Sequence, residues 1–344
     1  MRRTSKNARG LSCHISSTLA VSLLAFSGAC SGQTTIFGTL DLYVDWTKAR
    51  GKQLTRLDAS GLNSNRLGVK AVEPLSENTT ITAYMEMGFN PDTGDLTGLG
   101  FDKLNYLSIL GPGGRFAIGK QYTPQFIAMS RIDAFGSSFW GTPYAVFAGG
   151  NRYITAPRAL QYQTPRIVDN TLQVAAFYSF AAADEDPSRR QLFVSVQLWP
   201  NEAAYLALVV GRDQRYLQTS PKRNLVLLGA GYDLGTVRVS GGYQTLNDPN
   251  SSRSVREWTI GASAPLGSVD RLMVNYAHSS DQAMITKVAT TYGVAWTHAL
   301  SPTTSLYASV ARITNNVNSA RSFGMTVFNG ESTSNLMVGM RKHF

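Results

Sequence analysis

The chain has 344 residues and a formal net charge of +10, which is enough sequence for one large barrel or two ordinary domains. The charge falls to +6 (10 − 4) without the four basic residues before position 10, and no dense Lys/Arg run indicates nucleic-acid binding. After residue 32 no apolar run approaches the roughly 20 residues of a membrane helix, so a membrane form of this chain would have to be a closed β-barrel.

The first 32 residues resemble an export signal. A basic segment without acids runs from Arg2 to Arg9, an apolar core follows at residues 15–29, and small residues follow that core. The core is too short to remain as a membrane helix. We expect cleavage after Gly32, with the mature chain beginning at Gln33.

Both cysteines fall within this presequence. Removal of Cys13 and Cys30 leaves a mature chain without disulfides or thiol chemistry. The alternative is lipid modification of Cys30, which favours an apolar residue three positions earlier, where this chain has Ser27.

The first mature segment, residues 35–46, alternates between apolar and polar side chains. Leu40, Leu42, Val44 and Trp46 share one face, and Thr39, Asp41, Tyr43 and Asp45 share the other. Such alternation is typical of a barrel strand between lipid and water.

The same alternation recurs along the rest of the chain. It predicts about sixteen strands, at residues 35–46, 66–73, 79–89, 104–110, 115–121, 158–164, 171–180, 191–198, 203–211, 224–232, 236–245, 255–264, 269–279, 287–299, 303–313 and 335–344. An even strand number is typical of bacterial single-chain barrels.

The connections between these strands alternate in length. Short turns at 111–114, 199–202, 233–235, 265–268 and 301–302 separate long polar loops at 47–60, 90–102, 181–190 and 314–334. Short turns on one rim and long loops on the other indicate an all-β fold, a transmembrane antiparallel β-barrel.

One connection, residues 122–152, is both long and apolar. It keeps neither a strand period nor a helix period along its length, and connections of this kind usually have a function. Its apolar residues are Phe126, Ile127, Met129, Ile132, Phe135, Phe139, Trp140, Tyr144, Val146 and Phe147. We expect this third long loop to fold into the barrel and narrow its lumen.

Several segments resemble the Gram-negative general porin family. They are NRLGVKAVEPLSENTTITAYMEMGF (65–89), GPGGRFAIGKQYTP (111–124), ALSPTTSLY (299–307) and the closing GMRKHF. The resemblance covers residues 33–344 and implies a trimeric sixteen-stranded diffusion channel whose third loop forms the constriction. It also implies that residues 90–102 contact a neighbouring subunit.

The resemblance places the family's constriction arginine at Arg66. The other basic residues expected at the pore are Lys70, Arg152 and Arg158, which would favour anionic solutes. The acidic residues expected to face the lumen are Asp41, Asp45, Glu86 and Asp133. Arg131 is expected to pair with Asp133 within the loop.

Some positions depart from the family pattern. Pro302 and Thr303 stand where two basic residues are common, and Leu104 stands where some anion-selective members have an arginine. The inward loop has one carboxylate, Asp133. These departures bear on the strength of ion selectivity.

The resemblance also implies partners. These are a homotrimer, outer-membrane lipid and lipopolysaccharide, the barrel assembly machinery through the terminal Phe344, and small hydrophilic solutes and ions. Phe344 shares a face with Leu336, Val338 and Met340, which places it on the lipid side at a rim. No nucleic acid, cofactor or metal is expected.

Two alternatives stay open. A substrate-specific channel would show saturable block by one class of solute. An outer-membrane hydrolase would use the cluster of His278 with Ser279, Ser280 and Asp281, but consecutive strand residues face opposite sides. The segment 114–120 nearly matches a phosphate-binding loop, yet Gln121 stands where Ser or Thr would bind magnesium.

Overall fold

The computed structural model describes residues 32–182, 190–214, 223–249 and 251–344. The expected signal segment, apart from Gly32, lies outside these residues, as does most of the expected loop at 181–190. Residues 32–344 form one compact unit.

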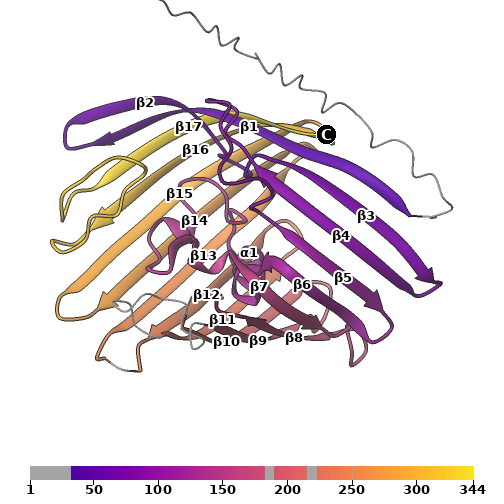
Figure 1. Cartoon of the computed structure of the whole chain (residues 1–344). Helices are drawn as coiled ribbons and strands as arrows, with labels where there is room; N and C mark the ends of the chain where they lie inside the picture. Colours follow the sequence, from indigo (N-terminus) through magenta and orange to yellow (C-terminus); the bar gives the residue numbers. More distant parts are fainter. Residues whose placement is uncertain (1–31, 183–189, 215–222, 250) are drawn as a thin grey trace, which may run out of the picture. The chain divides into compact units, whose positions relative to one another are not determined.

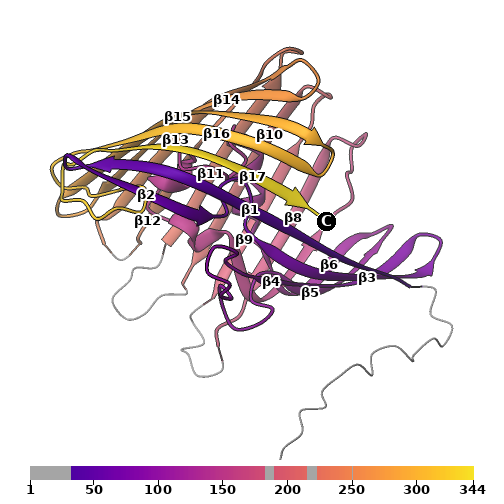
Figure 2. The same ribbon diagram turned by 90° about the horizontal axis from the view of Figure 1, so that it is seen from above.

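This unit is an antiparallel β-barrel (Figure 1, Figure 2). Its strands are β1 (Gln33–Ala49), β2 (Lys52–Ala59), β3 (Arg66–Ser76), β4 (Thr79–Gly88), β5 (Asn105–Gly111), β6 (Gly114–Tyr122), β7 (Thr155–Gln163), β8 (Leu172–Ser179), β9 (Gln191–Leu198), β10 (Ala204–Asp213), β11 (Arg223–Asp233), β12 (Arg238–Asn247), β13 (Ser254–Leu266), β14 (Asp270–Gln282), β15 (Thr286–Ser301), β16 (Thr304–Asn315) and β17 (Thr333–His343). The helical segments are α1 (Pro124–Ile132), η1 (Pro143–Ala145) and η2 (Gly150–Tyr153).

The seventeen described strands occupy sixteen barrel positions. β2 and β3 both pair with β1, and only residues 60–65 separate them, so they form one interrupted barrel strand. β1 also pairs with β17, which closes the ring. Gly38 and Phe344 exchange backbone hydrogen bonds of 2.9 and 3.1 Å at this seam. The predicted closed all-β barrel is therefore confirmed.

The alternation predicted for the first strand is present in β1. Asp41 and Asp45 are fully buried, whereas Leu40 on the opposite face is exposed. Large exposed hydrophobic side chains recur on the same outward face of the other strands, for example Val310 and Leu336. An apolar outward face is what a lipid-facing wall requires.

The structure corrects the prediction that residues 47–60 form a long polar loop. β1 continues to Ala49, turns at Arg50 and Gly51, and returns as β2. Both turn residues have positive φ, 57° and 68°, as a tight hairpin requires. β2 lacks an apolar face, which is why strand alternation did not reveal it.

No described helix is long and apolar enough to cross a membrane.

Candidate functional site

The segment that connects β6 to β7 contains a helix that the sequence analysis did not predict. Thr123 caps α1: its Oγ1 accepts a hydrogen bond from Phe126 N (3.2 Å), and Pro124 occupies the first helical turn. Thr-Pro is a recognised helix start, but the helix has only nine residues, too few to show a period within a long apolar run.

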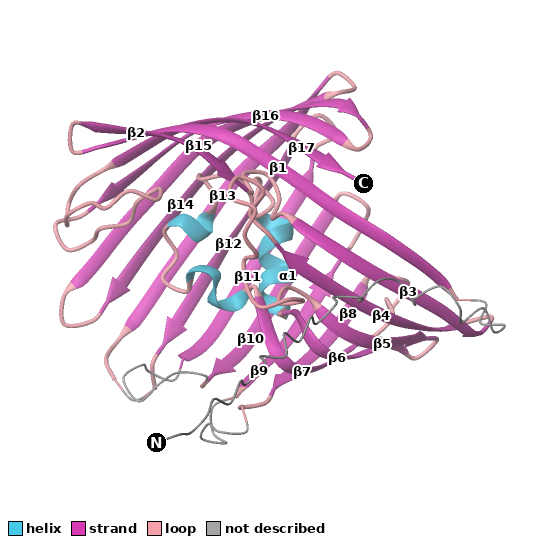
Figure 3. Cartoon of the chain, turned by 45° about the horizontal axis from the view of Figure 1, so that its top comes forward, coloured by secondary structure: helices cyan, strands magenta, loops and turns pink. Residues whose placement is uncertain are grey.

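The helix packs against inward-facing side chains of the opposite wall. Met129 and Ile132 are fully buried in one cluster with Phe193 and Leu227. Figure 3 shows the helical segments surrounded by the ring of strands. Connections of this kind are normally exposed, so burial inside the barrel accounts for the apolar composition of residues 122–152.

Two inward-facing glycines make room for Ile132. Gly229 and Gly242 are direct partners on β11 and β12, and a Cβ atom at Gly242 would lie 2.4 Å from Ile132 Cδ1. Because glycine has no side chain, Ile132 can lie close to the backbone of β11 and β12. This contact fixes where the end of α1 packs against the wall.

Polar contacts hold the rest of the segment. Ser240 Oγ donates to Ile132 O (2.8 Å), and Asn275 Nδ2 donates to Gly141 O (3.0 Å). Buried Glu257 accepts hydrogen bonds from the backbone N–H of Ala148 and from Gln244 Nε2 (2.8 Å). These anchors come from three neighbouring strands, β12, β13 and β14, and Phe139 N also donates to Gly61 O (2.8 Å) at the bend between β2 and β3.

Asp133 organises the turn that follows α1. Its carboxylate accepts hydrogen bonds from Phe135 N (3.0 Å), Ser137 N (2.8 Å) and Thr142 Oγ1 (2.8 Å). Burial raises the pKa of Asp133 to about 6, against the opposing effect of these three donors.

Arg131 does not pair with Asp133 as expected. Its guanidinium instead lies over the rings of Trp199 and Tyr205, at 5.3 and 5.6 Å from their centroids. The reason is that Asp133 turns toward backbone donors of its own loop, while Arg131 lies on the exposed side of the helix.

Arg66 and Glu86 lie together on the wall that the segment leaves uncovered. Arg66 Nε is 3.4 Å from Glu86 Oε1, and Tyr84 donates a hydrogen bond to the same oxygen (2.6 Å). Lys70 follows Arg66 on the same face of β3, is exposed and is paired in register with Tyr84. The structure therefore brings Arg66, Lys70 and Glu86 together.

Asp41 stabilises the bend between β2 and β3 through hydrogen bonds. Its carboxylate accepts hydrogen bonds from Leu62 N (2.8 Å), Asn63 N (2.6 Å) and the Tyr307 hydroxyl. Asn65 completes the bend by accepting from Asp41 N (2.6 Å).

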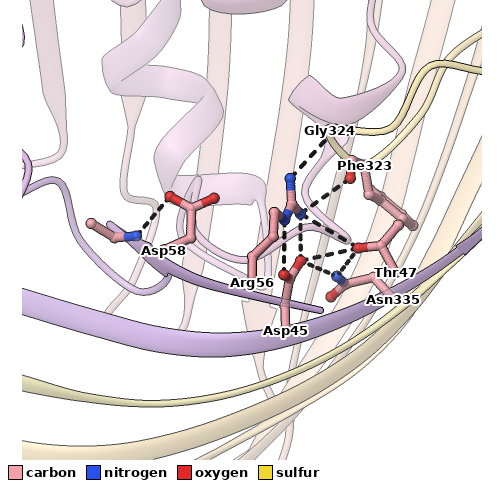
Figure 4. A network of polar contacts seen from close by, with 8 residues as sticks. Asp45, Thr47, Arg56, Asp58, Phe323, Gly324 and Asn335 are labelled. Carbon is pink, nitrogen blue, oxygen red and sulfur yellow. Dashed lines mark hydrogen bonds and ion pairs between the residues drawn. The ribbon is translucent and has the colours of Figure 1, made fainter. Parts of the chain in front are cut away.

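Asp45 belongs to a second network of hydrogen bonds and an ion pair inside the barrel (Figure 4). Arg56 binds it through Nε and Nη2, at 2.9 and 2.5 Å, and Asn335 Nδ2 donates to it at 2.7 Å. Arg56 also donates to the carbonyls of Phe323 and Gly324 (3.3 and 3.4 Å), so Asp45 helps to hold the loop between β16 and β17.

Arg158 and Arg152 are placed differently from Arg66. A register shift between β6 and β7 leaves Arg158 with a φ of 50°, on the outward face it shares with Leu160 and Tyr162. Its side chain donates to Phe180 O (3.4 Å). This placement separates Arg158 from Arg66, whereas the side chain of Arg152 lies outside the described part.

The sequence analysis also missed inward-facing cations, among them Lys103, Arg115 and Arg341. Lys103 passes across Gly88 beside Glu86; burial lowers its pKa, against the raising effect of Asp102 and Glu86. Arg115 lies over the ring of Tyr106 (4.9 Å), and Arg341 donates to Asn63 Oδ1 (2.6 Å). Strand alternation alone would have found Arg341, since Met340 faces outward.

The cluster that prompted the hydrolase alternative is divided by the strand. His278 lies on the outward face, where its Nδ1 is 2.9 Å from Thr290 Oγ1 and its ring lies near Trp258. Ser279, on the inward face, donates to Glu257 (3.0 Å). Within the described residues no group of three His, Cys, Asp or Glu side chains is arranged to hold a metal.

Comparison with known proteins gives consistent matches. The chain is 26% identical to outer membrane porin protein 32 of Delftia acidovorans over 367 aligned positions, covering 95% of this chain and 99% of that one. The fold matches the anion-selective porin from Comamonas acidovorans with a TM-score of 0.81 at 24% identity, covering 91% and 100% of the two chains. It matches the trimer form of OmpT from Vibrio cholerae with a TM-score of 0.67 at 15% identity, covering 91% and 99%.

A family model adds the decisive match. The model of the Gram-negative porins matches residues 17–318, which is most of the chain. Together with the closed barrel and its apolar outward face, this match shows that the chain belongs to the Gram-negative porin family of outer-membrane proteins.

Proposed function

We propose that this porin lets small hydrophilic solutes and ions diffuse passively across the outer membrane, with a preference for anions. Residues 122–152 would limit solute size, and the wall that carries Arg66 and Lys70 would sort solutes by charge. The solved porin from Comamonas acidovorans is named as anion-selective, which supports the direction of the preference.

The observation that carries this proposal is that the four acidic residues expected at the pore are buried or already paired with other groups of the protein. Asp41 and Asp45 are fully buried and bound to internal donors, and Asp133 is nearly so. Glu86 is matched by Arg66. The inward cations Lys70 and Arg115 have no carboxylate partner among the described residues, so the open wall keeps a positive excess. A charged wall of low dielectric constant focuses the field on the solute path.

The test is ion selectivity in a planar bilayer for the wild type and Arg66→Ala. Removing Arg66 deletes a lumen cation and leaves Glu86 without its partner, so the anion preference should fall. Lys342→Ala is the matched control, because it removes an outward-facing cation beside a short turn. The proposal fails if both variants keep the selectivity of the wild type.

We also propose a homotrimer in which residues 90–102 contact a neighbouring subunit. Leu99 in this loop is fully exposed, and Leu96 and Phe101 are exposed beside it, which is unfavourable for a loop that faces only water. The trimer form of OmpT supports the assembly by analogy.

The trimer proposal predicts that Leu99→Asp weakens assembly. A charge at the tip of an apolar contact costs desolvation without a partner, so the trimer band on unheated gels should dissociate at a lower temperature. Leu75→Asp, which changes an exposed leucine on the opposite rim, should leave the band in place. Equal dissociation temperatures for wild type and Leu99→Asp would contradict the role of this loop.

A further inference from the structure

Three aromatic side chains form a row on the inner face of the wall from β1 to β6. Phe37, Tyr84 and Tyr106 come from β1, β4 and β5, and the first two face inward on the same sides of their strands as Asp41 and Glu86. The ring centroids of Phe37 and Tyr84 are 5.3 Å apart, and those of Tyr84 and Tyr106 are 5.1 Å apart with an angle of 11° between the ring planes. All three side chains are half-buried. We call this set the aromatic row.

The aromatic row crosses β3 because that strand has a glycine beneath it. β3 lies between β1 and β4 (Figure 1), and Gly68 is the register partner of Phe37. A Cβ atom at Gly68 would overlap the end of the Phe37 ring. Because glycine has no side chain, the Phe37 ring can extend over β3 and reach Tyr84, so the row is continuous from β1 to β5.

Two cations without a carboxylate partner lie beside the aromatic row. Arg115 Cζ is 4.9 Å from the centroid of the Tyr106 ring. Lys70 is exposed and is the register partner of Tyr84. Among the described residues neither cation is in an ion pair. The wall therefore offers aromatic surface and positive charge at the same place.

The aromatic row lies on the path between Arg66 and the short turns. Phe37 is two residues from Thr39, the register partner of Arg66. Arg115, at the other end of the row, follows directly on the short turn at 111–114. A solute that crosses the pore would thus pass Arg66 and the aromatic row in succession.

We propose that the aromatic row, together with Arg115 and Lys70, binds planar aromatic carboxylates on their way through the pore. This inference rests on the proposed function and names one class of anion within it. An aromatic ring packs against other rings in an offset or edge-to-face arrangement, and a carboxylate forms a bidentate pair with a guanidinium. Binding at such a site is weak enough to let the solute leave again, as conduction requires.

The polar groups at the row select against other planar or ring-shaped solutes. A neutral sugar needs acceptors for its hydroxyl groups, but Glu86 already accepts a hydrogen bond from Tyr84 (2.6 Å) and lies 3.4 Å from Arg66 Nε. An organic cation would meet Lys70 and Arg115, which carry the same charge. An aromatic anion satisfies both the rings and the cations.

Block of the chloride current by two matched anions tests the proposal. Benzoate and cyclohexanecarboxylate carry the same charge and the same number of carbon atoms, but only benzoate has an aromatic ring. In planar bilayers at constant KCl concentration, benzoate should half-block the wild-type channel at a concentration lower by about threefold or more, because aromatic pairs add to affinity beyond the area that they bury.

A variant of the aromatic row provides the second arm. Phe37→Leu/Tyr106→Leu removes two rings and leaves Tyr84 and both cations in place, so the two anions should block it alike while its reversal potential in a KCl gradient stays on the chloride side. The matched control Tyr243→Leu/Tyr292→Leu removes two exposed rings from the outward face and should keep the difference between the anions. Gel mobility before and after heating confirms that each variant is folded.

The outcomes separate this inference from the proposed function. Equal block of the wild type by the two anions overturns the inference, as does an unchanged difference between them in Phe37→Leu/Tyr106→Leu. A wild-type reversal potential at zero or on the potassium side would instead contradict the proposed anion preference.

Discussion

At the residue scale, the acids expected at the pore serve mainly to build the barrel interior. Asp41 holds the bend between β2 and β3, and Asp45 binds Arg56 and the loop before β17. Strand alternation predicted that both face inward, and they do. Alternation cannot show which internal donors a carboxylate meets, because those donors come from distant segments such as Tyr307 and Asn335.

Asp133 should make the stability of the barrel depend on pH. Its pKa is about 6 in the folded chain against 3.8 for the ordinary side chain, so the folded state binds more protons between these values. The stabilisation is full below about pH 4 and is lost as pH rises through 6; its upper bound is about 3 kcal/mol.

Urea unfolding of wild type and Asp133→Asn at pH 4 and pH 7.5 measures this effect. Relative to the variant, the wild type should be more stable at pH 4 than at pH 7.5. A stability difference that is the same at both pH values would contradict the assignment.

At the scale of elements, alternation predicts strands well where lipid requires an apolar face. It missed β2, where Leu54 and Leu57 lie on opposite faces next to a long-loop hairpin. It also did not predict the register shift between β6 and β7, beside which Arg158 lies on the outward face with Leu160 and Tyr162. A bulge of this kind leaves no signal in the residue pattern.

The structure of the third long loop, residues 122–152, was also only partly predictable from the sequence pattern. Its apolar composition predicted a buried position, and its contacts with β8 to β14 are consistent with that. Helix α1 was missed although Thr123 and Pro124 mark its start, since nine residues give barely two turns and a half.

The docking of α1 gives a prediction at this scale. Ile132→Ala leaves a cavity between α1 and Gly229 and Gly242, and should cost about 2 to 5 kcal/mol. Ile127→Ala on the half-buried side of the same helix should cost less than the change at Ile132. Urea unfolding gives both values, and single-channel recordings should show more current noise for Ile132→Ala. Equal costs for the two variants would show that the helix is not seated as described.

At the scale of the molecule, the barrel divides into two walls. Residues 122–152 pack mainly against the wall from β8 to β16, with a further contact at the bend between β2 and β3, and the wall from β1 to β6 carries Arg66, Lys70, Glu86 and Arg115. This division follows from composition: inward-facing small and apolar residues such as Gly242 and Leu227 accept a loop, whereas charged ones remain toward water. The closed ring itself was predictable, because strands in lipid tolerate no open edge.

The most direct test of an anion-preferring channel is the reversal potential in a tenfold KCl gradient, for wild type and Glu86→Gln. The wild type should reverse on the chloride side. The reversal potential of Glu86→Gln should lie further toward the chloride side, because Arg66 loses its neutralising partner while both side chains keep their size. A reversal potential at zero or on the potassium side for both proteins would contradict the positive wall on which the proposed function rests.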